Sequence, residues 1–274
     1  MRRADLDASA LQPAVEVSRF RWSGAGLEAG SRRLPEETPI AIVHDASTSA
    51  VMMATPADLE DFAVGFSFTE GLIRSLSDIR DLEIVESDAG IELRLWLAEA
   101  PSTALVARRR RMVGPTGCGL CGVESLEQAI PPPRRVDSTL SISPRDVETA
   151  LAALVAVQPL GAATRAVHAA GYWDVTSRQI VVREDVGRHN ALDKLVGARL
   201  RSGGACGDGA VVLTSRVSVE RVQKAAAAGA PVLIAVSAPT ALAVRTAEEA
   251  GITLIAVARA DGFEIYSHSQ RLIA

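Results

Sequence analysis

The stretch GAVVLTSRVSVERVQKAAAAGAPVLIAVS occupies residues 209–237 and decides the fold. Its two apolar runs, Gly209–Thr214 and Pro231–Ser237, are short and rich in β-branched residues, which is typical of buried strands. Between them, Ser218–Ala228 has the length and apolar spacing of a helix. Two strands joined by one helix lie parallel in the same sheet, so this stretch predicts an α/β domain.

Residues on either side continue the alternation of strands and helices. We expect strands at Gln179–Glu184, Ile252–Ala258 and Phe263–Ser267, and helices at Ser143–Gln158, Gly187–Arg201 and Thr240–Ala250. Apolar strands that alternate with helices in this way predict a mostly parallel sheet covered on both faces. In such sheets, ligands bind beyond the carboxyl ends of the strands.

Polar residues follow three of the expected strands, and each polar group opens a helix. The candidate binding residues are Arg188, His189, Asn190, Ser215, Arg216, Ser237, Ala238, Pro239 and Thr240. Helix N-termini present free N–H groups that bind anions, so these residues predict a site for an anionic ligand. Helix capping alone would equally explain Ser215, Ser218 and Thr240, and it would also explain Asp185.

The first half of the chain predicts a smaller α+β domain. We expect strands at Ile40–His44, Ser49–Ala54, Ile91–Leu97 and Thr103–Val113, and a helix from Thr55, as its N-cap, to about Gly71. Residues 1–37 have little periodicity and predict a loose tail with one strand near Val15–Trp22. Pro131–Pro133 stops any regular element, which predicts a boundary between an N-terminal domain of residues 15–133 and a C-terminal domain of residues 134–274.

Two of the three cysteines, Cys118 and Cys121, lie in the glycine-rich segment Val113–Glu124. Such a segment favours a loop, because glycine weakens both helices and strands. Two thiols at this spacing could form a redox disulfide, share a metal ion, carry sulfur as a persulfide, or simply be buried. The run Arg108–Arg111 just upstream would favour a thiolate and attract an anion, although a charge run is more often a solvated face.

A zinc site would need two more ligands beside these thiols. The remaining candidates are Cys206, His44, His168, His189 and His268, and none of them forms a close pair in the sequence. The zinc deaminase signature combines His-x-Glu with Pro-Cys-x-x-Cys, and neither half is present around His168 or Cys118. We therefore expect no bound metal, with zinc kept as an alternative.

Composition restricts the class of function further. The formal net charge is −4 and aromatic residues make up 4%, which argues against binding nucleic acid. The chain lacks an apolar run of membrane-spanning length and an apolar segment after its charged start, so we expect neither a membrane protein nor a signal peptide. Three cysteines in 274 residues fit a reduced cytoplasm better than a disulfide scaffold.

Several stretches resemble the FdhD/NarQ family of formate dehydrogenase accessory sulfurtransferases. They are Asp61–Gly71, Cys118–Gly122, Glu184–Lys194, Ser215–Arg216, Gln223–Ala226 and Ser237–Thr240. The resemblance runs from about residue 40 to the end of the chain. It implies a C-terminal three-layer domain similar to cytidine deaminase, without its zinc chemistry, and a homodimer. It also implies a sulfur carrier that works with a cysteine desulfurase and formate dehydrogenase.

In that family resemblance, Cys118 would carry the persulfide, with Cys121 as its partner, and the acceptor would be the molybdenum bis(molybdopterin guanine dinucleotide) cofactor. The resemblance adds cofactor contacts at Phe263, Glu264, Ile265, Tyr266, Ser267 and His268. Before the histidine that corresponds to His168 the family usually has two glycines, whereas this chain has Arg165 and Ala166. The alternative function is a chaperone that binds the cofactor and does not need the thiols.

Overall fold

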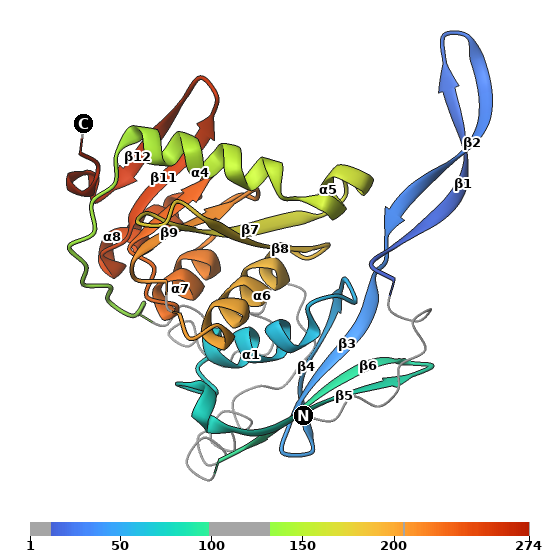
Figure 1. The fold of residues 1–274 in the computed structure, drawn as a ribbon, viewed down its shortest axis with the longest axis horizontal. Coiled ribbons are helices and arrows are strands. Elements are labelled where there is room, and N and C mark those ends of the chain that lie inside the picture. Colours follow the sequence, from blue (N-terminus) through green and yellow to red (C-terminus); the bar gives the residue numbers. More distant parts are fainter. Residues whose placement is uncertain (1–11, 99–131, 205, 274) are drawn as a thin grey trace.

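A computed structural model describes residues 12–98, 132–204 and 206–273. Cys118, Cys121, the arginine run and the strand expected at Thr103–Val113 lie outside the described residues. The described chain forms a small sheet with one helix, a larger sheet with helices on both faces, and a two-stranded arm (Figure 1). It is a mixed α/β fold.

The small sheet is built from the first half of the chain and has the strand order β4-β3-β6-β5. Its elements are β3 (Thr38–His44), β4 (Ser47–Ala54), α1 (Leu59–Thr69), the short helix η1 (Leu76–Asp78), β5 (Ile79–Ser87) and β6 (Gly90–Leu97). Ile40 and Ile42 of β3 and Leu93 of β6 are buried against Phe62 of α1. The strand expected at Ile91–Leu97 is confirmed as β6, and it is half-buried, with every second side chain packed on the α1 side.

The larger sheet has six strands in the order β12-β11-β10-β9-β7-β8. Its elements are α4 (Pro144–Ala156), α5 (Pro159–Thr164), β7 (His168–Asp174), β8 (Ile180–Asp185), α6 (Arg188–Arg201), β9 (Gly209–Leu213), α7 (Val219–Ala227), β10 (Val232–Ala235), α8 (Ala241–Ala250), β11 (Thr253–Arg259), β12 (Gly262–Ser267) and η2 (Ser269–Arg271). The expected alternation of strands and helices is confirmed for this half of the chain.

The strand directions correct the prediction of a mostly parallel sheet. Only the β9/β10 and β10/β11 pairs are parallel, whereas β7 is antiparallel to both of its neighbours and β12 is antiparallel to β11. Because β8 is antiparallel to β7 and β7 is antiparallel to β9, β8 points the same way as β9, β10 and β11. The carboxyl ends of four strands therefore lie at one edge, which we call the rim.

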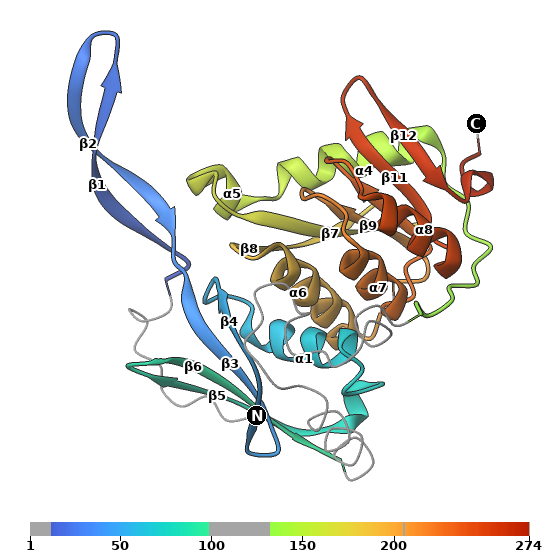
Figure 2. The ribbon, with the colours of Figure 1, turned by 180° about the vertical axis from the view of Figure 1, so that it is seen from behind.

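Helices cover both faces of this sheet, as Figures 1 and 2 show. Val211 and Leu213 of β9 pack with α6, α7 and α8, whereas Ala210 and Val212 of the same strand pack with α4. Successive side chains of a strand point to opposite faces, so a strand between two helical layers must be apolar throughout. This is why the run at residues 209–213 has no polar alternation.

The two sheets are joined through a close crossing of α1 and α6. A Cβ atom added to Gly65 of α1 would lie 1.7 Å from the backbone oxygen of Asp193, and one added to Gly197 of α6 would lie 1.8 Å from that of Asp61. Each helix therefore uses a glycine where the other helix's backbone approaches. Arg201 adds an ion pair across the crossing, at 2.5 Å from the Asp61 carboxylate.

The first described residues form a hairpin, β1 (Ala14–Ser23) with β2 (Gly26–Pro35), that extends away from both sheets (Figures 1 and 2). For residues 14–35 the expectation of a loose tail was wrong, although a strand near Val15–Trp22 was expected. The tip exposes Phe20, Trp22 and Leu27, at 72%, 75% and 66%. At the root, Arg32 donates to the carbonyl oxygen of Thr164 at 3.1 Å.

Several other expectations need correction. Thr55 is not the N-cap of α1, because the helix begins after Asp58, which has a φ of 52°. The strands β2, β5 and β7 and the helix α5 were not expected from the sequence. The strand β7 was missed because its residues Ala169, Ala170 and Gly171 have low strand propensity, and it is a strand because both of its neighbours pair with it.

Candidate functional site

Backbone hydrogen bonds hold the loops at the rim together. The N–H of Val217 donates to the carbonyl oxygen of Ala238 at 3.3 Å, and the N–H of Thr240 donates to that of Val217 at 2.9 Å. The N–H of Val257, at a bulge of β11, donates to the carbonyl oxygen of Ser237 at 3.3 Å. The segments that follow β9 and β10 therefore lie beside each other and beside the carboxyl-terminal part of β11, as their predicted shared edge requires.

The start of α6 is fixed by a buried carboxylate rather than by a helix cap. Asp185 accepts hydrogen bonds from the N–H groups of Gly187 at 2.7 Å and Thr55 at 3.0 Å, and Lys194 lies 2.6 Å from its second oxygen. Both Asp185 and Lys194 have 0% side-chain exposure. Asn190 donates to Asp185 and also to the carbonyl oxygen of Met53 at 2.9 Å. Asn190 therefore connects the N-terminal unit, by which we mean the small sheet with α1, to the start of α6.

Thr55 is the other half of this connection. Its hydroxyl accepts from the N–H of Val186 at 3.1 Å and its carbonyl accepts from Lys194 at 2.8 Å. The N–H, the hydroxyl and the carbonyl of Thr55 are thus bonded to Asp185 at the end of β8, to Val186 in the turn and to Lys194 in α6. Its partners lie about 130 positions away in the chain, so no local pattern could have identified them.

Arg188 and His189 occupy the first turn of α6 at the rim. Arg188 is exposed, whereas His189 is half-buried with Nε2 2.6 Å from the carboxylate of Glu220 in α7. The hydrogen bond from His189 lowers the pKa of Glu220, so this carboxylate is ionised and occupied. The two helix starts, α6 and α7, are therefore in direct contact.

Arg221 is a rim residue that sequence analysis missed. It lies in the first turn of α7, has 0% exposure, and donates from Nη1 to the carbonyl oxygen of Arg188 at 2.6 Å. Burial lowers the pKa of Arg221 to about 10, with Arg188 as a further cause, and the guanidinium still stays protonated at pH 7. The sequence contains one indication that Arg221 is unusual. It lies in the first turn of an expected helix, where the helix dipole favours an acidic residue.

His168 opens β7 opposite Asp185, between the strands that lead into α6 and α7. Burial lowers the pKa of His168, and the neighbouring Arg221 and Arg188 lower it further. The imidazole is consequently neutral at pH 7. The preceding Arg165 ends α5 with a φ of 56°, a left-handed conformation that a glycine adopts without strain.

The other predicted rim residues differ in their surroundings. Thr240 is an N-cap whose hydroxyl accepts from the N–H of Ala243 at 3.2 Å, so capping explains its position. Ser215 is buried and donates to the carbonyl oxygen of Arg216, whose side chain is exposed. Ser237 and Pro239 are half-buried and Ala238 is exposed.

The strand β12 does not lie wholly at the rim. Because it is antiparallel to β11, Gly262 pairs with Arg259 at the rim and Ser267 pairs with Leu254 at the far end. Phe263 and Glu264 therefore start near the rim, Ile265 and Tyr266 follow, and Ser267 and His268 lie at the opposite edge. There Ser267 bonds to the backbone of β11, and His268 Nε2 lies 2.9 Å from the Glu248 carbonyl oxygen.

A family model described as the FdhD/NarQ family matches residues 35–273, which include both sheets and the whole rim. The chain belongs to the FdhD/NarQ family. It is 52% identical over 265 residues to "Sulfur carrier protein FdhD" of Agrobacterium fabrum, covering 94% of this chain and 98% of that one. Proteins of the same name from Brucella abortus and Cupriavidus necator are 51% and 49% identical over 94% and 92% of this chain, and the matches cover 96% and 88% of those proteins.

The fold is shared with a solved structure from Desulfotalea psychrophila, which is described as a formate dehydrogenase accessory protein. The two agree with a TM-score of 0.73 at 24% identity, over 96% of this chain and 100% of the other. The family membership predicted from the sequence is thus confirmed. The cytidine-deaminase-like layering of the FdhD/NarQ fold and the domain boundary at residues 133/134 stay predictions.

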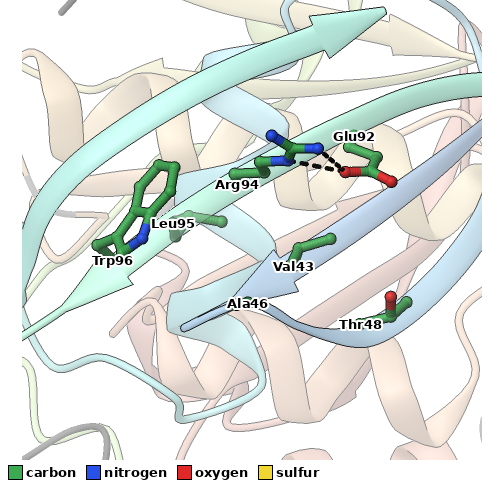
Figure 3. A pocket seen from close by; sticks show the side chains of 7 residues that line it. All are labelled: Val43, Ala46, Thr48, Glu92, Arg94, Leu95 and Trp96. Atoms are coloured by element: carbon green, nitrogen blue, oxygen red, sulfur yellow. Dashed lines mark hydrogen bonds and ion pairs between the residues drawn. The ribbon is translucent and has the colours of Figure 1, made fainter. Parts of the chain in front are cut away.

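Two further features complete the description of this FdhD/NarQ chain. A hollow of about 250 Å³ lies on the face of the small sheet turned away from α1, where Arg94 is paired with Glu92 and lies beside Trp96 (Figure 3). Among the residues that the structure describes, no three His, Cys, Asp or Glu side chains gather as a metal site, and no helix is long and apolar enough to span a membrane.

Proposed function

We propose that this protein is a sulfur carrier that accepts sulfur as a persulfide on Cys118 and transfers it to the molybdenum bis(molybdopterin guanine dinucleotide) cofactor for formate dehydrogenase. The observation that carries the proposal is the end-to-end similarity, at 49–52% identity, to proteins named sulfur carrier protein FdhD. The Cys-x-x-Cys pair at Cys118 and Cys121 supplies the reactive group that such a role requires.

The loading step needs a thiolate and a donor persulfide, which a cysteine desulfurase would provide. The thiolate of Cys118 attacks the terminal sulfur of the donor persulfide, forming a new S–S bond at Cys118 and releasing the donor's cysteine as a thiolate. No electrons are gained or lost overall, so the step needs no oxidant. The arginines upstream of the cysteines favour the thiolate form.

Release of the terminal sulfur as sulfide requires two electrons, and Cys121 can supply them. Its thiolate attacks Sγ of Cys118, hydrosulfide leaves, and a Cys118–Cys121 disulfide remains. A dithiol reductant then restores both thiols. In this series of reaction steps the two cysteines have different roles, since only Cys118 carries the sulfur and only Cys121 releases it.

The rim supports binding of an acceptor with anionic groups. Arg188 and Arg216 are exposed cations at the starts of neighbouring segments, and helices α6 and α7 present their N-terminal N–H groups there. Arg188, Arg216 and the helix N–H groups would hold the acceptor's phosphates, and Phe263 and Glu264 at the near end of β12 would contact its guanine groups. Ser267 and His268 lie at the far edge of the sheet, so direct contact from them to the same group is not part of the proposal.

Intact mass tests the sulfur carrier. After incubation with a cysteine desulfurase and cysteine, the wild-type protein should gain one sulfur, about 32 Da, which a reductant removes. The gain should be absent in Cys118→Ala, present in Cys206→Ala, and retained without sulfide release in Cys121→Ala. A Cys118→Ala protein that still restores formate dehydrogenase activity in cells would overturn the proposal.

The second candidate is a chaperone that binds the cofactor through the rim and does not use the thiols. The cluster of Arg188, Arg216 and Arg221 at helix N-termini favours it, because these residues do not depend on either cysteine. A wild-type protein that binds guanine nucleotide but never gains sulfur would support this candidate. The homodimer and the cytoplasmic location stay predictions.

A further inference from the structure

The β1–β2 hairpin has no covered face within the described chain. It extends away from both sheets (Figures 1 and 2), and most of its side chains are exposed. An isolated two-stranded hairpin is at best marginally stable in water, because it buries little apolar surface. Here the pairing continues without interruption from Ala14 and Pro35 at the root to Ser23 and Gly26 at the tip. A hairpin of this length is kept most readily where another surface covers one of its faces.

The pairing register gives the tip of the hairpin one apolar face. Trp22 lies opposite Leu27, and Phe20 lies opposite Ala29. Directly opposite residues point to the same face of a hairpin, and so do residues two positions apart. These four side chains therefore form one patch, which we call the arm patch. Arg21 lies between Phe20 and Trp22 in the chain and points to the other face. The tip thus has the two-faced pattern of a half-buried hairpin, although the described residues bury neither face.

A second uncovered surface lies on the small sheet, on the face turned away from α1. Val51 and Met53 of β4 are 64% and 46% exposed there, because the alternate residues of this strand pack toward α1. The hollow of about 250 Å³ lies on the same face and is lined by Val43 of β3 and Trp96 of β6, among others (Figure 3). It is smaller than most ligand pockets, which measure about 300–1,000 Å³, and suits a single large side chain. We call this surface the sheet patch.

The two patches lie on strands of opposite net charge. The strands β1 and β2 contain four arginines and two glutamates. The strands β5 and β6 of the small sheet contain four acidic residues and two arginines. Opposite charges steer two surfaces together, while aromatic and other apolar side chains at the centre of an interface provide most of the affinity. The arm patch and the sheet patch are therefore complementary in charge, and both have an apolar centre.

We propose that the arm patch of one copy docks on the sheet patch of a second copy, so that two chains exchange arms about a two-fold axis. The connectivity allows both contacts to form together, since β2 ends at Pro35 and β3 of the small sheet begins at Thr38. The arm is thus a direct extension of the sheet that accepts the other arm. Two such units laid antiparallel place each arm along the other copy's sheet, which is an isologous arrangement.

The size of the exchanged contact matches a stable dimer. A standard interface uses about 20–30 residues from each partner. Each copy would contribute two ten-residue strands and one face of a four-stranded sheet, which reaches that number. Phe20 and Trp22 would be the central aromatic anchors, one of them in the hollow of the sheet patch.

Sedimentation of the full chain over a range of concentrations tests the dimer. The wild type should sediment as a dimer, and Phe20→Ser combined with Trp22→Ser should raise the dissociation constant about 100-fold or more, since each buried aromatic anchor contributes about tenfold or more. Both residues are exposed in the single chain, so the circular dichroism spectrum should not change. The matched control is Val155→Ser in α4, because that side chain is also 72% exposed but lies on the larger sheet's helical layer. It should leave the dimer intact.

Cross-linking between two different chains tests the acceptor surface. One chain carries Ala29→Cys in the arm patch and the other carries Val51→Cys in the sheet patch, both with Cys118 and Cys121 replaced by serine. A short bismaleimide should join the two chains. When Val155→Cys replaces Val51→Cys in the second chain, we expect no product.

Each other outcome overturns the inference in a recognisable way. A wild type that is monomeric at every concentration excludes a second copy as the occupant. If its arm variants then fail to support formate dehydrogenase in cells, the arm docks on a different protein. A dimer that the arm substitutions do not weaken, or a cross-link to Val155→Cys only, excludes the exchange of arms. The inference does not depend on sulfur transfer, since a dimer that never gains sulfur would overturn the sulfur carrier and leave the arm exchange intact.

Discussion

Replacing Gly65 by alanine should destabilise the protein strongly, although alanine is the better helix former. The added Cβ would lie 1.7 Å from the carbonyl oxygen of Asp193 and 2.7 Å from the nitrogen of Gly197, both backbone atoms of α6. The two helices must separate by about 1.3 Å to restore even a 3.0 Å contact. That shift would also lengthen the hydrogen bond that the Thr69 hydroxyl of α1 donates to the Asp193 carboxylate of α6.

Overpacking of this kind costs about 1–3 kcal/mol, and the backbone clash puts Gly65→Ala at about 3 kcal/mol. The intrinsic preference for alanine in a helix offsets roughly 1 kcal/mol of any such cost. For a chain of this size, the net loss of about 2 kcal/mol lowers the melting temperature by roughly 4–8 °C. Urea unfolding followed by circular dichroism gives the free energy directly.

The control is Gly24→Ala, because Gly24 has no described atom within 4 Å of the position its Cβ would take. We expect that substitution to change the free energy of unfolding by less than about 0.5 kcal/mol. A Gly65→Ala protein as stable as the wild type would refute the close crossing of α1 and α6. Destabilisation by Gly24→Ala of the same size would show that the loss is not specific to the crossing.

Three further predictions test the buried polar groups. Lys194→Met should lower the free energy of unfolding by about 3–5 kcal/mol, because it leaves the carboxylate of Asp185 charged and buried. The control, Arg178→Met, removes a half-exposed ion pair and should lower it by less than about 1 kcal/mol. Equal losses for the two variants in urea unfolding would contradict this prediction. Burial raises the pKa of Cys206 to about 12, so at pH 8 its thiolate fraction is on the order of 10⁻⁴ and iodoacetamide should modify it only in denaturant, as read by peptide mass mapping. The pKa of His168 lies below its ordinary value, so the imidazole gains a proton, and a positive charge, only as the pH falls below about 6.5. The affinity for sulfate should rise over that range in the wild type but not in His168→Gln. A wild-type affinity that does not change with pH would argue against His168 at the anion site.

The larger sheet could be predicted because its signal is local. A strand buried on both faces must be apolar throughout, and residues 209–213 and 232–235 meet that requirement with no help from distant residues. The strand β7 lacks this signal, since its alanines and glycine give little strand preference and its pairing is imposed by β8 and β9. The hairpin β1–β2 lacks it too, because nearly all of its residues are exposed and alternation has no meaning without a buried face.

The candidate site likewise contains some residues whose positions could be predicted from the sequence and others whose positions could not. Arg188, Ser215, Arg216 and Ser237 could be predicted to lie together, because carboxyl ends of strands that point one way share an edge. The position of Arg221 could not be predicted, because an arginine in an amphipathic helix is more often exposed. Only the packing of α7 against α6 shows that Arg221 is buried. Ser267 and His268 were grouped with the rim by resemblance, whereas the antiparallel direction of β12 puts them at the opposite edge.

The start of α6 connects the two halves of the molecule mechanically. Asp185 binds Thr55, Gly187, Asn190 and Lys194, so the first turn of α6 is held by the N-terminal unit as much as by its own strand. That turn carries the carbonyl oxygen of Arg188, which orients the guanidinium of Arg221. A movement of the N-terminal unit would therefore shift the guanidinium of Arg221 at the rim. Ligand binding at the rim should therefore weaken in Thr55 or Asn190 variants that still fold.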